Sequence, residues 1–173
     1  MKDNKNLPNV HLRAIEPEDL DTLYMVENNT ELWSVGSTNV PYSRYTLHDY
    51  VANSSNDIYS DKQVRMIVSD DENATTGIVD LVNFNPQHQR AELGIVILKH
   101  MRGKGYAKAA IKSIMSYALT ILHLHQLYVI VDVNNTVSIN LFLDMGFEKN
   151  TELKDWLYDG RDYHNAAVMQ TFL

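Results

Sequence analysis

A short glycine-bearing segment, Arg102-Gly103-Lys104-Gly105-Tyr106-Ala107, has the residue types that bind a phosphate group. It follows a strand-like run and precedes a helix-like one, so the free N–H groups at the helix start would attract an anion. Gly103 and Gly105 lack the Cβ atoms that would keep a pyrophosphate away from the backbone. The segment is therefore predicted to bind a pyrophosphate, and the alternative is an ordinary turn with two solvated basic residues, Arg102 and Lys104.

Two other phosphate-binding motifs do not fit this loop. A Walker P-loop requires the spacing G-x-x-x-x-G-K-[ST], which is absent from the segment. A Rossmann fingerprint requires G-x-G-x-x-G after the first strand, whereas this loop lies late in the chain. A nucleotide would thus have to be bound in another way.

The runs around the loop alternate between strand and helix patterns, which indicates an α/β or α+β layered domain. Helical spacing of apolar residues makes the segment after the loop the clearest helix. The apolar run 127–133 predicts a strand buried on both faces, and Asp159-Gly160 predicts a hairpin turn. Strands are predicted over 11–15, 63–69, 77–84, 91–98, 127–133, 147–158 and 162–172, and helices over 16–28, 44–54, 104–122 and 135–145.

The composition limits the classes of function. A length of 173 residues fits a single domain over residues 1–173, in which only the polar first nine or so residues are expected to be flexible. The absence of cysteine excludes disulfides, thiolate metal sites and a cysteine nucleophile. His123-x-His125 has no third ligand at a supporting spacing, so no metal is expected.

Charge and hydropathy bear on partners and location. A formal net charge of −7 argues against nucleic acid and suits a cationic small molecule or basic peptide, although solubility alone would also account for it. No apolar run approaches the roughly 18 residues that span a bilayer, so no membrane partner is expected. The first residues lack the apolar core of a signal peptide, and a cytoplasmic location is expected.

Beyond the loop, the chain resembles the GNAT superfamily of N-acetyltransferases, whose R/Q-x-x-G-x-G/A loop binds the pyrophosphate of acetyl-CoA. The resemblance runs from His11 to Phe172 and is closest to the branch of spermidine N-acetyltransferases and ribosomal-protein N-terminal acetyltransferases. It implies the GNAT fold: a mixed, mostly antiparallel sheet with helices on both faces and a V-shaped split between central strands. The stretches that carry it are L-R-A-I-E-P-E-D-L, Q-H-Q-R-A-E-L-G-I, M-R-G-K-G-Y-A, L-Y-V-I-V-D-V-N-N, F-L-D-M-G-F and Y-D-G-R-D-Y-H-N-A.

The resemblance implies where acetyl-CoA, as co-substrate, would bind. Its pyrophosphate would lie on the loop from Arg102 to Ala107. Its pantetheine arm would pair with exposed main chain of the strand before the loop, and Asn135, with the small Ser138, would line its other side. Asn135 could equally be a simple helix cap. The full set of expected cofactor-binding residues is Ile95, Val96, Ile97, Arg102, Gly103, Lys104, Gly105, Tyr106, Ala107, Asn134, Asn135 and Ser138.

Amine acetylation needs a neutral amine, and an alkylamine with a pKa of about 10.4 must first lose a proton. Glu92 is the preferred carboxylate, because the two-residue period places it on one strand face with Gly94 and Val96. In the related branch the matching glutamate lies in the substrate site, where it could bind the ammonium group, accept its proton, or both. The alternative is a surface glutamate paired with Arg90.

The chain departs from the family pattern at several positions. Many members place a general-acid tyrosine where this chain has Phe142, so water, Tyr128 or Tyr163 would have to serve, or the thiolate would leave unaided. The loop over 33–42 lacks the acidic cluster of spermidine acetyltransferases, and a second acidic position of the sheet is Asn83. Asp80 keeps an acid nearby, so Asp80, Asn83 and Glu92 are the expected substrate-binding residues.

The expected function is therefore direct acetyl transfer from acetyl-CoA to a primary amine in a ternary complex, with a polyamine such as spermidine as one acceptor. A protein N-terminal acetyltransferase acting on a basic peptide N-terminus is the alternative. A third possibility, of another class, is an acyl-CoA-binding sensor or scaffold with little turnover, for which Phe142 is the support. The oligomeric state stays open, and a homo-oligomer is compatible with these readings.

Overall fold

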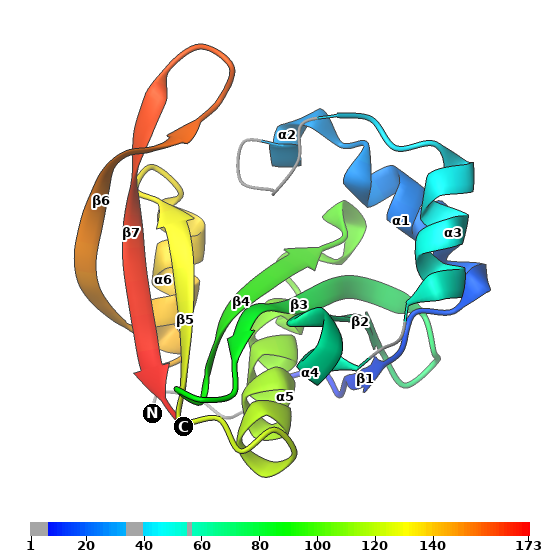
Figure 1. Ribbon diagram of the computed structural model, residues 1–173, viewed down its shortest axis with the longest axis horizontal. Coiled ribbons are helices and arrows are strands. Elements are labelled where there is room, and N and C mark those ends of the chain that lie inside the picture. The colour runs from blue at the N-terminus through cyan, green and yellow to red at the C-terminus, as the bar shows by residue number, and fades with distance from the viewer. Residues whose placement is uncertain (1–6, 34–39, 55–56) are drawn as a thin grey trace.

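The computed structural model describes residues 7–33, 40–54 and 57–173, and it contains one seven-stranded sheet (Figure 1). Neighbouring strands are antiparallel except β4 and β5, which are parallel. The spatial order is β1-β2-β3-β4-β5-β7-β6. The strands are β1 (His11–Arg13), β2 (Val64–Ser69), β3 (Thr75–Asn85), β4 (Arg90–Ile97), β5 (Gln126–Asp132), β6 (Glu148–Tyr158) and β7 (Tyr163–Phe172).

The helices follow the predicted order, and the differences are confined to short turns. The predicted helix over 16–28 opens with a 3₁₀ turn, Pro17–Asp19, before α1 begins. Three further short elements were not predicted, because three or four residues are too few to show helical periodicity. The α-helices are α1 (Leu20–Glu27), α2 (Thr30–Trp33), α3 (Arg44–Asn53), α4 (Ile58–Asp61), α5 (Tyr106–Thr120) and α6 (Thr136–Asp144), and a 3₁₀ turn spans Lys99–Met101.

Helices cover both faces of the sheet, as predicted, and the two-residue period of the strands divides the core accordingly (Figure 1). Ile67 of β2 and Ile78 of β3 pack with Leu23 of α1 and Leu47 of α3 on one face. Their neighbours along the same strands point to the other face, where the larger cluster includes α5 and α6. Each of these two strands is therefore buried on both sides.

The prediction that 127–133 is buried on both faces is wrong for β5. Leu127, Val129 and Val131 are buried, but the alternating positions Tyr128, Ile130 and Asp132 are half-buried. The reason is that α1 and α3 pack on β2 and β3, which leaves the second face of β5 partly uncovered. A uniformly apolar run does not distinguish this arrangement from full burial.

The sheet divides between β4 and β5, which confirms the predicted V-shaped split (Figure 1). The two strands pair only where Arg90–Glu92 meets Gln126–Tyr128. Past that point β4 stays paired with β3 as far as Ile97, while β5 stays paired with β7 as far as Asp132. The strands thus diverge, each held by its partner on the far side.

Two aromatic rings close the core beside the split. Phe142 of α6 and Phe147, just before β6, are 4% and 2% exposed, and their centroids lie 5.1 Å apart in an edge-to-face arrangement. Gly146 between them adopts a left-handed backbone (φ 89°), which ends the helix and turns the chain towards β6. The pair therefore joins α6 to the sheet.

We expect Phe147→Ala to lower the free energy of unfolding by roughly 3–5 kcal/mol, because it removes a fully buried ring and leaves a cavity. Urea denaturation followed by circular dichroism measures this change. Phe172→Ala is the matched control: that ring is 60% exposed, and its loss should cost less than about 1 kcal/mol. Equal losses for the two variants would contradict the assigned core.

Candidate active site

The predicted pyrophosphate loop joins β4 to α5 with the backbone geometry that an anion site needs. Gly103 and Gly105 have φ values of 75° and 87°, in the left-handed region that glycine adopts without strain. Gly105 is the N-cap of α5, and its carbonyl accepts the first helical hydrogen bond, from the N–H of Ala109 at 3.1 Å. The N–H groups of the first helical turn are therefore presented at the loop.

Arg102 has a role that the sequence did not reveal. Its Nε donates a hydrogen bond of 3.0 Å to the carbonyl of Ile97, the last residue of β4. The loop is thereby tied to the end of the strand, and this carbonyl already has a partner. Among the three predicted pantetheine positions, Ile95 and Val96 are half-buried at the split.

The two loop glycines have different surroundings. A Cβ built on Gly105 would lie 3.1 Å from Cδ of Pro8 and 3.4 Å from a methyl group of Leu7, so the N-terminal segment packs directly against it. A Cβ on Gly103 would meet no atom within 4 Å. Gly103 therefore faces open space, and a side chain placed there probes the anion site without a steric clash.

Glu92, Asn83 and Tyr128 come together where the split begins. Asn83 lies at an irregularity in the pairing of β3 with β4 and has a positive φ of 51°, which an asparagine tolerates better than most residues. Its amide Nδ2 donates to Oε2 of Glu92 at 2.8 Å. Tyr128 of β5 is the register partner of Glu92 across the parallel pairing. The cluster unites three strands at the apex of the split.

The phenol of Tyr128 is tuned by this position. Burial raises its pKa above the ordinary value, and the negative charge of nearby Glu92 raises it further. The pKa-lowering influences of the Asn83 amide and of Arg90 are weaker. A tyrosine in this state keeps its proton at neutral pH and is available as a donor.

The predicted orientation of Glu92 is confirmed by the burial of its neighbours. Ala91 and Leu93 are buried in the core on the α5 side, whereas Glu92 and Gly94 are half-buried on the opposite face. The alternative pairing with Arg90 is not found, since the ion pairs of the described residues do not include Glu92. No cationic side chain forms an ion pair with its carboxylate in the described part of the chain.

Asp80, whose contact with substrate stays a prediction, forms an ion pair with an arginine. Nε of Arg65 lies 2.6 Å from Oδ1 of Asp80, and the same guanidinium also pairs with Glu27 of α1. The three side chains are between 19% and 27% exposed, so the ion pairs are shielded from water. Sequence reasoning missed Arg65 and Glu27, although an arginine inside the apolar run of β2 requires carboxylate partners.

The structure gives different surroundings to Phe142, at the expected general-acid position, and to the two tyrosines proposed in its place. Phe142 is a core residue packed against Phe147, on a helix that faces the apolar side of the sheet. Tyr163 is exposed in the β6–β7 hairpin and packs on Tyr158, with ring centroids 4.9 Å apart. Of the two tyrosines suggested by the sequence, Tyr128 is the one that lies beside Glu92.

The start of α6 has the helix cap foreseen as an alternative. The side chain of Asn135 accepts a hydrogen bond from the N–H of Ser138 at 3.1 Å. The N–H of Asn134 donates to Oδ1 of Asp132 at 2.8 Å, which shapes the turn between β5 and α6. Contact of Asn134, Asn135 and Ser138 with a cofactor stays a prediction.

Other features of the described residues bear on the earlier expectations. A cavity of about 490 Å³ lies between α3, α4 and β2, lined in part by Asp49, Tyr50 and Arg65, and it includes none of the predicted cofactor positions. Among the described residues, no group of three or more histidine, aspartate or glutamate side chains could hold a metal ion. No helix in the described ranges is long and apolar enough to cross a membrane. Of the first nine or so residues, predicted to be flexible, residues 1–6 lie outside the described part, whereas Leu7 and Pro8 pack against Gly105. Residues 34–39 of the loop without carboxylates also lie outside the described part.

Comparison with known proteins gives consistent relatives. The family model described as "Acetyltransferase (GNAT) domain" matches residues 9–148. Spermidine N(1)-acetyltransferase of Escherichia coli (strain K12) is 32% identical over 173 residues, covering 96% of this chain and 89% of that protein. The putative ribosomal N-acetyltransferase YdaF of Bacillus subtilis (strain 168) is 25% identical, covering 91% and 88%. The crystal structure of spermidine N-acetyltransferase from Vibrio cholerae in complex with CoA and spermine has a TM-score of 0.84 at 29% identity and covers 95% of both chains.

We expect the phenol of Tyr128 to titrate above the ordinary tyrosine pKa of about 10, because it is partly buried and faces Glu92. NMR of ring-labelled tyrosine, assigned with Tyr128→Phe, measures the value. Glu92→Gln should lower this pKa without restoring the ordinary value, since burial remains. No change in Glu92→Gln would show that the two side chains do not interact.

Proposed function

The chain belongs to the acetyltransferase (GNAT) domain family, and on that premise we propose that it moves the acetyl group of acetyl-CoA to a primary amine bound at Glu92. One observation carries this proposal. The split between β4 and β5 has the predicted pyrophosphate loop at its wide end and the Glu92–Asn83–Tyr128 cluster at its apex. If acetyl-CoA bound along β4, its pyrophosphate would therefore lie at the loop and its acetyl group would lie near Glu92.

The chain's own groups would hold acetyl-CoA in an extended form. The loop N–H groups and Lys104 would bind the pyrophosphate at the positive end of the α5 dipole. The edge of β4 at Ile95 and Val96 faces the split without pairing to β5, so its main-chain groups can bind the amides of the pantetheine arm. The carbonyl of Ile97 already accepts a hydrogen bond from Arg102, so only its second lone pair is left for the cofactor.

Glu92 would prepare the acceptor for reaction. An alkylammonium ion is mostly protonated at neutral pH, and the Glu92 carboxylate attracts it and takes up its proton, directly or through water. The neutral nitrogen then forms a bond to the acetyl carbon as the carbon–sulfur bond breaks, and the second proton that the nitrogen loses passes to the departing thiolate, through Tyr128 or water. The Asn83 amide fixes the Glu92 carboxylate for this purpose at 2.8 Å.

Tyr128 would take the place of the tyrosine that Phe142 replaces. A thiol with a pKa of about 8.5 leaves tolerably well as a thiolate, so only modest proton donation is needed. The raised pKa of Tyr128, caused by burial and by Glu92, keeps its hydroxyl protonated at neutral pH. Positioning of the two substrates in one split would supply most of the rate enhancement.

The first acceptor to test is a polyamine, because relatives of similar length are spermidine N-acetyltransferases. The Arg65 guanidinium offsets one of the two negative charges of Asp80 and Glu27, so this part of the acceptor side is less acidic than its composition suggests. One unpaired carboxylate at Glu92 suits a single terminal amine, and such an amine could also be a protein N-terminus. The relation to YdaF at 25% identity keeps that alternative.

A turnover assay tests the proposal. Thiol release from acetyl-CoA is measured with spermidine, spermine, a simple alkyl monoamine and a basic peptide with a free N-terminus. Release that depends on a primary amine supports acetyl transfer, and the ratio of kcat/KM values identifies the acceptor class. Tight acetyl-CoA binding without release for any acceptor would instead favour a sensor or scaffold.

We expect Glu92→Gln to lower kcat by about 10²–10⁴-fold while leaving acetyl-CoA affinity unchanged, because it removes the proton acceptor and not the cofactor site. Steady-state kinetics and calorimetry measure the two quantities. Glu148→Gln, an exposed glutamate on β6, is the matched control. Turnover at the unsubstituted rate near pH 7 in Glu92→Gln would remove this residue from catalysis.

We expect Gly103→Asp to weaken acetyl-CoA binding at least about tenfold more than Gly103→Asn does, because a negative charge would face the pyrophosphate. Both side chains tolerate a left-handed backbone comparatively well, so Gly103→Asn controls for shape and strain. Calorimetry at low salt measures both affinities. Equal affinities would show that the anion does not lie at this loop.

A further inference from the structure

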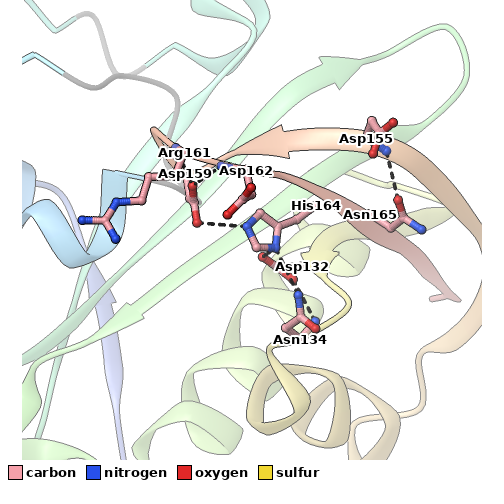
Figure 2. A network of polar contacts seen from close by, with 8 residues as sticks. All are labelled: Asp132, Asn134, Asp155, Asp159, Arg161, Asp162, His164 and Asn165. Atoms are coloured by element: carbon pink, nitrogen blue, oxygen red, sulfur yellow. Dashed lines mark hydrogen bonds and ion pairs between the residues drawn. The ribbon is translucent and has the colours of Figure 1, made fainter.

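His164 of β7 lies between two turns that are distant in sequence (Figure 2). Its Nε2 is 3.0 Å from Oδ2 of Asp159, in the turn between β6 and β7. On the other side its Nδ1 is 3.1 Å from the amide nitrogen of Asn134 and 3.8 Å from Oδ2 of Asp132. The ring therefore connects the tip of the hairpin with the turn that begins α6.

The charged groups around the ring favour its protonated form. The hydrogen bond to Asp159 raises the pKa of His164 against the effect of burial, and Asp132 and Asp162 raise it further. The N–H groups of Asp162 and Arg161 lower the pKa of Asp159 to about 2, so that carboxylate is ionised at any physiological pH. The Arg161 guanidinium points away from the ring (Figure 2).

The two protonation states of His164 make different demands on Asn134. A neutral ring that donates from Nε2 to Asp159 has an unprotonated Nδ1, which accepts a hydrogen bond from the Asn134 amide. A protonated ring carries a hydrogen on Nδ1 as well, and it then attracts the Asp132 carboxylate. The Asn134 amide must turn its oxygen towards that hydrogen. Protonation of His164 therefore reverses the orientation of the Asn134 side-chain amide.

This amide belongs to the turn that positions the expected pantetheine contacts. Oδ1 of Asp132 accepts from the N–H of Asn134 at 2.8 Å, and the Asp132 carbonyl accepts from the N–H of Asn135 at 2.9 Å. Asn135 in turn caps α6 through Ser138. A change at His164 is therefore passed to Asn135 through two hydrogen bonds of one aspartate.

We propose that His164 is a positioning residue for the cofactor site. Its protonated form pairs with both Asp159 and Asp132, and so ties the hairpin tip to the β5–α6 turn and holds that turn in the geometry that binds acetyl-CoA. The proposal rests on the proposed function, because it takes acetyl-CoA as the ligand. Protonated His164 adds stability that is complete below the unfolded-state pKa of about 6.5 and is lost as pH rises through the higher folded-state value. Acetyl-CoA affinity should weaken over the same range above pH 6.5.

Calorimetry of acetyl-CoA binding between pH 6 and 9 tests the proposal with three proteins. The unsubstituted chain should lose affinity about fivefold or more as pH rises, relative to His164→Arg, which keeps a cation at every pH. His164→Gln should bind weakly at low pH and lack this loss. The phosphate monoester on the ribose of acetyl-CoA also titrates near pH 6, but all three proteins share that contribution.

A fourth protein separates the histidine from general effects of substitution. Asp159→Asn keeps the ring and an oxygen for the turn amides but removes the charge that raises the pKa of His164. The pH at which affinity falls should therefore move lower. NMR of the unliganded protein should show the Asn134 side-chain amide shifting with the midpoint of His164.

The outcomes distinguish a failure of the role of His164 from a failure of the proposed function. Binding by the unsubstituted chain with a pH profile parallel to that of His164→Gln would overturn the role of His164 and leave the proposed function intact. An Asn134 amide that does not follow the histidine titration would do the same. Absence of acetyl-CoA binding by the unsubstituted chain at every pH would overturn both proposals.

Discussion

The parting of β4 from β5 depends on what each strand does on its other side. β5 remains paired with β7 through Asp132, while the end of β4 is drawn onto β3, where Gly77 opposes Ile97. A Cβ on Gly77 would lie 2.4 Å from the carbonyl oxygen of Val96, so only the absence of a side chain allows this approach. Leu98 then donates to Thr76 at 3.0 Å, which extends the attachment to the start of the loop.

Charge is distributed unevenly around this parting. The chain carries a net charge of −7, and Arg65 offsets one of the two negative charges of Asp80 on β3 and Glu27 on α1. Glu92 lies at the apex beside the Asn83 amide and the Tyr128 phenol, without an ion-pair partner among the described residues. A carboxylate without a cationic partner among the described residues therefore lies at the point where the amine and the thioester would meet.

The sequence was sufficient for the position of the loop, the order of the elements along the chain and the face of Glu92, because each follows from local spacing or from the resemblance. The ion pairs of Arg65 could not be predicted, since they join β2 to α1 across 38 and to β3 across 15 positions of the chain. The orientation of the Asn83 side chain depends on an irregularity in the pairing of β3 with β4, which the sequence does not indicate. The burial of the second face of β5 depends on which strands α1 and α3 cover, and the pattern of residues within β5 does not indicate this.

The short pairing of β4 with β5 also makes a seam in the domain. Three residue pairs, with the hydrogen bonds from the N–H groups of His125 and Gln126 to the Gln89 carbonyl, connect one half of the sheet to the other, and side chains of the shared core beneath add to them. Such a seam can open at lower cost than the whole domain unfolds. A molecule lodged in it would act as a missing strand, so the melting temperature would rise with the logarithm of its concentration, and the supply of substrate would protect the enzyme from proteolysis.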